Sequence, residues 1–321
     1  PVSAGGCEGD QVTITLTVNA EPVLDPALDN TVCSDEASGI VLAVSAGSVS
    51  ATSYNITAIN VDAGLTPAAG NATIGNGKSA NAIASDRFTN LTAGPLNVVY
   101  DIVPVSAAGC LGDLVQVTLT VNPEPILSTT LDLSVCSEVP IGLVLDVEAG
   151  SVAAVGYHIM TIDVATGLTP DAGNATVGNN QPANALAGDV FTNTTGGALN
   201  VVYHVVPVSA DGCEGDLEQV VVTIDPQPVL SPNLNTTVCS DLPTGLVLNV
   251  ASGSVPAANY NILAITVDAG LVAGAGNAVV ANSVAANYLA NDVFTNTTGG
   301  SLTVVYDVVP VSAGGCEGDM R

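Results

Sequence analysis

Cysteine is the residue whose spacing in this sequence most clearly indicates chemistry. Four of the seven cysteines stand 103 residues apart, namely Cys7, Cys110, Cys213 and Cys316. The other three keep the same step, namely Cys33, Cys136 and Cys239. Recurring thiols can form disulfides or bind a metal. Because no two cysteines are closer than 26 residues and the sequence has 2 histidines, it does not predict a clustered zinc site.

Acidic residues follow the cysteines in a recurring Cys-Glu-Gly-Asp turn, and carboxylates are the ligands that Ca²⁺ prefers. The weak Ca²⁺ candidates are Glu8, Asp10, Glu214, Asp216, Glu317 and Asp319. One copy of the turn carries Leu111 in place of Glu, and a second recurring set is Asp86, Asp189 and Asp292. Since the sequence contains no dense acidic loop, we expect a solvated turn whose Asp caps backbone amides, and no cofactor.

The two histidines do not recur, which argues against general-base catalysis. His158 corresponds to Asn55 and Asn261 in the other copies of the repeat, and His204 corresponds to aspartates. The serines and threonines have no partner base in the sequence pattern. The sequence therefore predicts no enzyme. Asn-x-Ser/Thr sequences occur seven times, and we interpret them as turn and edge residues.

These residues belong to a repeat of 103 residues that carries the signals of short β-strands. Leu96–Ser106 and Leu114–Asn122 are apolar or alternating segments joined by a glycine turn, which predicts a hairpin. Further strands are expected at 39–44, 53–61 and 87–92, with loops and edge strands at 62–84. About seven short strands per ~100 residues predict an all-β fold of tandem immunoglobulin-like sandwiches, arranged end to end.

Pro-containing joints at 19–22, 122–125 and 225–228 divide the sequence into modules. We expect residues 1–22 to be the final strand of a preceding repeat with its linker. Residues 23–125, 126–228 and 229–321 are the three predicted sandwiches, the third without its last strand. Residues 1–10 recur at 310–319, so the sequence is expected to be a window on a longer array. The alternative is donor-strand exchange, in which residues 11–19 of one molecule complete the last repeat of the next.

Two disulfide pairings fit this repeat. Within each repeat the pairs are Cys33–Cys110, Cys136–Cys213 and Cys239–Cys316. Across each joint they are Cys7–Cys33, Cys110–Cys136 and Cys213–Cys239. We expect the first strand to start at the same pole as the last hairpin turn, with a final strand of ~30 Å between that turn and the next repeat. A disulfide needs Cα atoms within about 7 Å, so we predict the first set, with Cys7 paired outside the sequence.

Composition excludes several classes of partner. The 30 acidic and 3 basic residues give a net charge of −27, which excludes nucleic-acid binding and disfavours anionic membranes. No apolar run is long enough to insert in a membrane. Disulfides predict an oxidising compartment, that is, an extracellular or cell-surface location.

The hairpin VVYDVVPVSAxGCxGD…VTLTVNPxP, followed by VCSD or VCSE, resembles the PKD-like repeats of giant Bacteroidetes surface adhesins, including gliding-motility adhesins of the SprB type. The resemblance covers every repeat. It implies a β-sandwich fold, export by the type IX route and display as surface filaments. The expected partners are neighbouring repeats, head to tail, and surface glycans or substratum.

Three functions remain in competition at this stage. The first is the stalk or filament of a cell-surface adhesin, in attachment or gliding. The second is an array of binding modules attached to an exported enzyme. The third is a self-assembling polymer such as a pilus, sheath or surface layer, because a mean hydropathy of +0.49 with few charges suggests buried contacts between modules.

If the Cys-Glu-Gly-Asp turns bind no metal, chelation should leave the melting temperature unchanged. Scanning calorimetry with and without EDTA measures this directly. A drop of more than a few degrees that added Ca²⁺ restores would instead assign the turns as Ca²⁺ sites.

Overall fold

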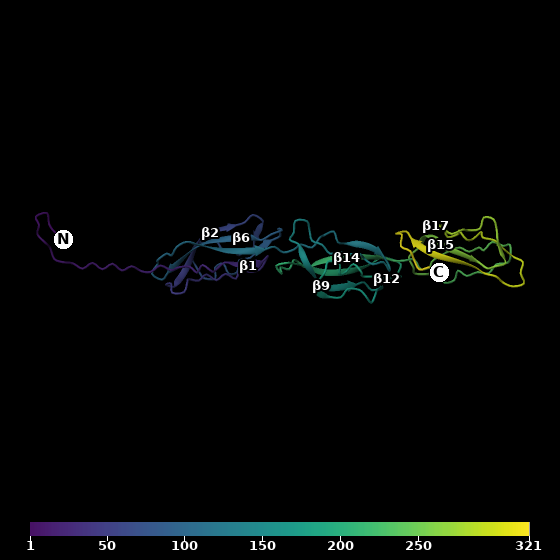
Figure 1. The fold of residues 1–321 in the computed structure, drawn as a ribbon, viewed down its shortest axis with the longest axis horizontal. Coiled ribbons are helices and arrows are strands. Elements are labelled where there is room, and N and C mark those ends of the chain that lie inside the picture. The colour runs from purple at the N-terminus through teal and green to yellow at the C-terminus, as the bar shows by residue number, and fades with distance from the viewer. Residues whose placement is uncertain (321) are drawn as a thin grey trace. The chain divides into compact units, whose positions relative to one another are not determined.

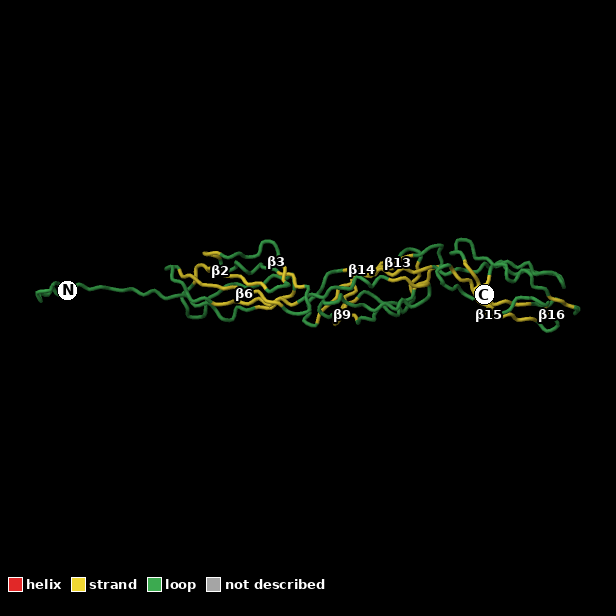
Figure 2. The backbone as a smooth tube through the Cα atoms, turned by 90° about the horizontal axis from the view of Figure 1, so that it is seen from above, coloured by secondary structure: helices red, strands yellow, loops and turns green. Residues whose placement is uncertain are grey.

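The computed structural model describes residues 1–320 as strands joined by turns and loops (Figures 1 and 2). Within these residues there is no helix, and so none that is long and apolar enough to cross a membrane. The chain divides into two compact units, Pro1–Glu124 with Gly150–Val152, and Pro125–Ala149 with the described residues from Ala153 onward. The prediction of an all-β fold is confirmed.

The first unit contains a five-stranded sheet in the order β1-β7-β6-β2-β4. Its strands are β1 (Asn30–Cys33), β2 (Ala51–Val61), β4 (Gly75–Lys78), β6 (Leu96–Ser106) and β7 (Val115–Asn122). β3 (Leu65–Pro67) and β5 (Phe88–Asn90) form a separate antiparallel pair. β1 runs parallel to β7, whereas the other neighbours in the sheet are antiparallel. The first strand of this repeat therefore lies beside its last strand.

The second unit contains a complete repeat with the same arrangement, followed by a third repeat with a smaller sheet. Its five-stranded sheet has the order β11-β9-β13-β14-β8. The strands are β8 (Leu133–Cys136), β9 (Ala154–Val164), β11 (Gly178–Gln181), β13 (Leu199–Ser209) and β14 (Glu218–Asp225), with β10 (Leu168–Pro170) and β12 (Phe191–Asn193) as the separate pair. A three-stranded sheet, β17-β15-β19, follows. It comprises β15 (Ala257–Val267), β17 (Ala281–Val284) and β19 (Val304–Ser312), beside the pair β16 (Leu271–Ala273) and β18 (Phe294–Asn296).

The core of each complete repeat lies between the large sheet and a facing layer of short pairs and loops. Alternate residues of β6 point inward, and Val98, Tyr100 and Ile102 are 0% exposed. Leu42 and Phe88 meet them from the facing layer as part of one apolar cluster. Alternation with period two is what a strand with one buried face requires, which is why the hairpin was predictable from the sequence.

One predicted strand, residues 39–44, is not a strand in the structure. Gly39 has a φ of 64°, and the segment bonds to residues 80–84 at separate points, such as Leu42 N to Ala80 O at 2.8 Å. Ile40 and Leu42 are buried while Val41 is exposed, so the alternation is real. The segment therefore has the side-chain pattern of a strand without a continuous ladder of hydrogen bonds.

Within residues 1–320 the sheet of the third repeat has three strands, and part of its core is exposed. β19 pairs with β15 and has no strand equivalent to β7 or β14 on its other edge within the described residues. Residues 236–239, which match β1 and β8, are exposed and form no strand. Tyr306 is partly exposed, whereas its equivalents Tyr100 and Tyr203 are 0% exposed.

A tyrosine–aspartate pair recurs in each repeat and is buried in the first two. The Tyr100 hydroxyl donates to Asp86 Oδ2 at 2.8 Å, and Asp86 Oδ1 accepts from the Ala72 amide at 2.7 Å. Tyr203 bonds to Asp189 and Tyr306 to Asp292 in the same way, each at 2.7 Å. The recurring aspartates, one of the two acidic sets noted in the sequence, thus anchor a core tyrosine and a loop amide.

Burial raises the pKa of the Tyr100 and Tyr203 hydroxyls well above the ordinary value of 10, and the neighbouring carboxylate adds to the rise. Burial likewise raises the pKa of Asp86, against the opposing effect of its two hydrogen bonds. Burial therefore disfavours ionisation of the tyrosine hydroxyls and of the Asp86 carboxyl.

We predict that the unfolding free energy falls as the pH rises above about 10. The folded-state pKa of these tyrosines is raised, so the unfolded chain loses their protons first, and stability that is full below pH 10 is lost above it. Each of Tyr100 and Tyr203 should contribute up to about 1.4 kcal/mol per pH unit. Urea unfolding between pH 8 and 11.5 measures the slope.

The control is Tyr203→Phe, which should make that slope shallower. At neutral pH it should cost about 1–2 kcal/mol, because Asp189 loses a buried donor. A slope unaffected by this substitution would contradict the prediction.

Candidate structural site: the disulfide at the joint between repeats

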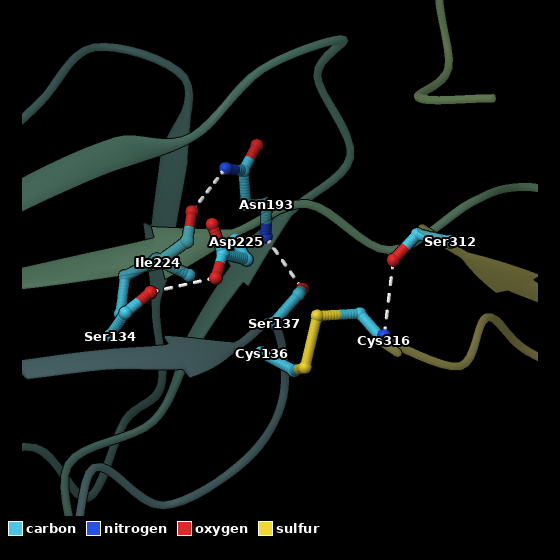
Figure 3. Close-up of a disulfide and its surroundings, with 8 residues drawn as sticks. All are labelled: Ser134, Cys136, Ser137, Asn193, Ile224, Asp225, Ser312 and Cys316. Carbon is cyan, nitrogen blue, oxygen red and sulfur yellow. Dashed lines mark hydrogen bonds between the residues drawn. A yellow bond between two sulfur atoms is a disulfide. The ribbon is translucent and has the colours of Figure 1, made fainter. Parts of the chain in front are cut away.

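A disulfide joins Cys136 to Cys316, across 180 residues of sequence (Figure 3). The Cα atoms are 5.4 Å apart, within the usual range for the bond. Cys136 is the last residue of β8, and Cys316 lies in the turn that follows β19. The bond therefore links the first strand of one repeat to the last hairpin turn of the following repeat. We call it the staple.

Strand direction places Cys136 at the far pole of its repeat. β8 runs parallel to β14 in a register that pairs Leu133 with Val222 and Cys136 with Asp225. Asp225 ends β14 and opens the joint to the next repeat. Cys213 precedes β14, and the eight residues of that strand span about 27 Å. The two cysteines of one repeat thus lie at opposite poles.

A glycine in each turn holds the second cysteine against the joint. A Cβ added to Gly318 would overlap the carbonyl oxygen of Pro228, the last residue of the joint. Gly215 meets Pro125 in the same way, and Gly112 meets Pro22. The turn of each repeat is thereby packed on the joint through which the chain enters that repeat. In the second unit, this brings Cys316 to the pole where Cys136 ends.

The predicted disulfide pairing is wrong. Cys136 is bonded to Cys316, so neither Cys136–Cys213 nor Cys239–Cys316 forms, and Cys110 is free, so Cys33–Cys110 does not form. The cross-joint alternative fails as well, because Cys7, Cys110 and Cys239 are free. Cys33 and Cys213 are both disulfide-bonded. The error concerned the place of the cysteine on the first strand. The prediction put this cysteine beside the last turn, whereas Cys136 ends β8 and lies about one strand length from that turn.

Hydrogen bonds fix the first-strand side of the staple (Figure 3). The Ser134 hydroxyl donates to Asp225 Oδ2 at 2.7 Å, and the Ser137 hydroxyl accepts from the Asn193 amide at 2.8 Å. Asn193 also donates from Nδ2 to the Ile224 carbonyl at 2.8 Å and is 0% exposed. Asn193 of this Asn-x-Thr sequence is therefore a buried structural residue.

The turn side is held by a serine and by the glutamate that follows the cysteine. The Ser312 hydroxyl accepts from the Cys316 amide at 3.0 Å. Glu317 Oε1 accepts from Asn261 Nδ2 at 2.9 Å, and Glu214 Oε1 lies 3.3 Å from His158 Nε2. The acidic residues of two turns thus contact a side chain of the neighbouring strand.

His158 occupies a structural position that asparagine fills in the other repeats. Its Nδ1 accepts from the Asn180 amide at 3.0 Å, as Asn55 Oδ1 accepts from Gly77 and Asn261 Oδ1 from Ser283. His204 lies 3.1 Å from Asp163 on the adjacent strand. Across residues 1–320, no three His, Cys, Asp or Glu side chains gather closely enough to hold a metal ion.

A polar hollow of ≈ 430 Å³ lies beside the turn of the third repeat, lined by Asn259, Asn261, Ser283 and Glu317 among others. Its groups are amides, hydroxyls and one carboxylate. The buried Asn259 Oδ1 has no hydrogen-bond partner there. Ser53 and Gly156 occupy the matching positions in the other repeats, so this amide is particular to the third repeat.

Sequence reasoning missed the glycines and serines around the staple. The signal was present, because Gly112, Gly215 and Gly318 keep the 103-residue step, as do Ser34, Ser137 and Ser240. A glycine that recurs outside a turn's positive-φ position indicates a close backbone approach. Its partner, the proline carbonyl of the joint, could be identified only from the fold.

The family model of the PKD-like domain matches three segments of the chain, residues 30–125, 144–228 and 257–320. No curated protein matches it. Each matching segment contains all or most of one of the sheets described above, with β8 just outside the second segment, which supports tandem modules of one fold.

Three of the solved structures that match this chain share little sequence with it. The protocadherin GammaB4 extracellular domain is 12% identical with a TM-score of 0.25, over 93% of this chain and 49% of that chain, so this chain spans about half of its length. The chicken CNTN1 FN1-FN3 domains are 11% identical with a TM-score of 0.24, over 91% and 96%. The sialic acid binding region of a Streptococcus sanguinis SK1 adhesin is 10% identical with a TM-score of 0.21, over 94% and 98%.

We predict that Gly215→Ala destabilises the protein by about 2–3 kcal/mol, because its methyl group would overlap the Pro125 carbonyl and push the turn off the joint. Chemical denaturation measures the change. Gly173→Ala is the matched control, since a Cβ there meets nothing within 4 Å, and it should change stability by less than about 0.5 kcal/mol. Equal effects of the two substitutions would contradict the role assigned to Gly215.

Proposed function

Since the chain belongs to the PKD-like domain family, we propose that it is a non-enzymatic part of the stalk or filament of a cell-surface adhesin. Its PKD-like domains and disulfides are typical of an extracellular, adhesion-type repeat protein. The resemblance to gliding adhesins extends the proposal to export by the type IX route and to a role in attachment or gliding.

The observation that carries this proposal is the staple. Repeats two and three are joined both by the peptide chain at 225–228 and by the bond from Cys136 to Cys316. A disulfide confined to one repeat would stabilise that repeat alone. One that spans a joint connects neighbouring modules covalently at a second point, which suits a structure that carries tension along its length.

Under tension the staple takes the load off the chain that it encloses. Force applied beyond Cys136 and Cys316 passes through the sulfur atoms and bypasses the residues between them. In the chain-entropy account, closure of this loop of about 180 residues stabilises the folded state by up to about 5 kcal/mol. Both effects favour a stalk that neither extends nor unfolds readily.

The surface chemistry is consistent with a spacer role. The net charge of −27 keeps such a protein soluble and repels other acidic surfaces. The side chains with the most potential for chemistry, the two histidines and the acidic turns, serve as hydrogen-bond partners of the strands. We therefore propose no catalytic role and no cofactor for these modules, and glycans or substratum as partners elsewhere on the adhesin.

Single-molecule pulling from the two ends of the chain tests the proposal. The oxidised chain should extend by at least about 60 nm less than the reduced chain, the contour length of the 180 residues that the staple encloses. The control replaces Cys33, Cys136, Cys213 and Cys316 with serine, because Cys33 and Cys213 are also disulfide-bonded, and it should remove that difference. Antibody labelling of intact producing cells should place the modules outside the cell.

Two results would overturn the proposed function. One is an oxidised chain that extends as far as the reduced chain, which would show that the staple bears no load. The other is labelling confined to permeabilised cells.

A further inference from the structure

We propose that Asn76 is a site of spontaneous covalent modification, at which the backbone nitrogen of Gly77 converts the side-chain amide into an acid, and that the Asn55 side chain slows this reaction. The inference goes beyond the proposed stalk function and does not depend on it. It rests on a local geometry that recurs in all three repeats, with a different residue at the position that decides reactivity.

The reaction is the cyclisation of an asparagine onto the residue that follows it. The Gly77 nitrogen bonds to Asn76 Cγ, the bond from Cγ to Nδ2 breaks, and the Gly77 proton leaves with that nitrogen as ammonia. Water then opens the cyclic imide at either of its carbonyl carbons. One opening leaves aspartate at position 76, and the other leaves isoaspartate, in which the main chain runs through the former side chain. Water is the only co-reactant.

Asn76 is the only asparagine of the sequence that precedes a glycine. Glycine has no Cβ, so its nitrogen can approach the preceding side chain without the crowding that any other residue causes. Asn76 and Gly77 are both exposed, which gives water access to the imide. Because the reacting atoms belong to adjacent residues, the reaction is intramolecular and needs no enzyme.

The pair lies in a bulge of an edge strand. β4 ends the order β1-β7-β6-β2-β4, so within the described residues it has a neighbouring strand on one side only. Its register with β2 includes Gly75 and Lys78 and shifts between them, which places Asn76 and Gly77 in the bulge. A bulge at a sheet edge opens more readily than the interior of a sheet. The Gly77 nitrogen can therefore turn toward Asn76 Cγ without disrupting the core.

Asn55 holds the reactive nitrogen in its resting position. Its Oδ1 accepts a hydrogen bond from the Gly77 N–H at 3.0 Å. To attack, the Gly77 nitrogen must lose this proton and turn toward Asn76, and both changes require the hydrogen bond to break. A hydrogen bond of ordinary strength therefore slows the reaction of the folded chain about fivefold relative to a chain without it.

The other two repeats hold the same bulge with a different residue after the asparagine, namely Asn179–Asn180 in β11 and Asn282–Ser283 in β17. The residue after the asparagine has a positive φ in each repeat, 69°, 51° and 56° in chain order. Its amide donates to His158 in the second repeat and to Asn261 in the third, as it does to Asn55 in the first. Because the backbone and the acceptor are alike, the side chain of this residue is the difference that should decide the rate.

Incubation of the purified 321-residue chain at mildly alkaline pH, followed by peptide mapping with mass spectrometry, tests the proposal. We expect aspartate and isoaspartate to accumulate at Asn76 at least about tenfold faster than at Asn179 or Asn282. The rate should rise with pH, because the attacking nitrogen must lose a proton. The same chain unfolded in urea should react faster at Asn76, since the hydrogen bond to Asn55 is then absent.

Residues already present in the second repeat provide matched substitutions. Gly77→Asn introduces the residue type that holds this conformation at Asn180, and it should slow the reaction at least about tenfold. The reverse change, Asn180→Gly, should make Asn179 reactive. Asn55→Ala removes the acceptor and should speed the reaction about fivefold. Asn55→His keeps an acceptor, as His158 does, and should leave the rate within about twofold of the unmodified chain.

An Asn76 amide that stays intact in the folded chain while the unfolded chain reacts would overturn the modification site. Equal rates at Asn76 and Asn179 would overturn the part assigned to glycine. An unchanged rate in Asn55→Ala, with a melting temperature showing that this variant is folded, would overturn the part assigned to Asn55. None of these results would affect the stalk function, which depends on the Cys136–Cys316 bond and is tested by pulling.

Discussion

The parallel pairing of the first strand with the last strand is the constraint on which the rest of each repeat depends. Parallel strands carry their carboxyl ends to the same edge, so β8 must finish where β14 finishes. That edge is the exit of the repeat, and the next repeat presents its hairpin turn there. The position of the staple and the exposed state of residues 236–239 both follow from this pairing.

A second constraint, the contact of a turn glycine with a joint proline, links the interior of each repeat to its neighbour. A side chain at Gly215 or Gly318 would overlap the carbonyl oxygen of Pro125 or Pro228. The turn therefore packs directly against the backbone of the joint. The asparagine and serine beside Cys136 complete the other side. Backbone atoms and short side chains make most of these contacts.

The sequence predicted what local pattern controls. The hairpin of β6 and β7 follows from alternation and a glycine turn, and the bounds of β6 agree with the predicted Leu96–Ser106. The PKD-like family was also recognisable, from the hairpin and the residues around Cys136. The disulfide pairing was not predictable in this way, because the partner of each cysteine depends on which pole of the repeat its strand ends at. That is set by pairing between residues about 90 apart, such as Ser134 with Thr223. The prediction of a strand at residues 39–44 was wrong for a related reason, because side-chain alternation does not show whether the backbone forms a ladder of hydrogen bonds.

The staple also changes what a single break in the backbone would do. Between Cys136 and Cys316 the chain forms a closed loop, so hydrolysis of any one peptide bond within the loop leaves both ends attached through sulfur. A proteolytic nick there would not detach what lies beyond it. Cuts within the loop separate the two ends of the chain only when the Cys136–Cys316 bond is reduced as well. The same bond that would carry tension in a stalk thus also keeps the chain connected after cleavage within the loop.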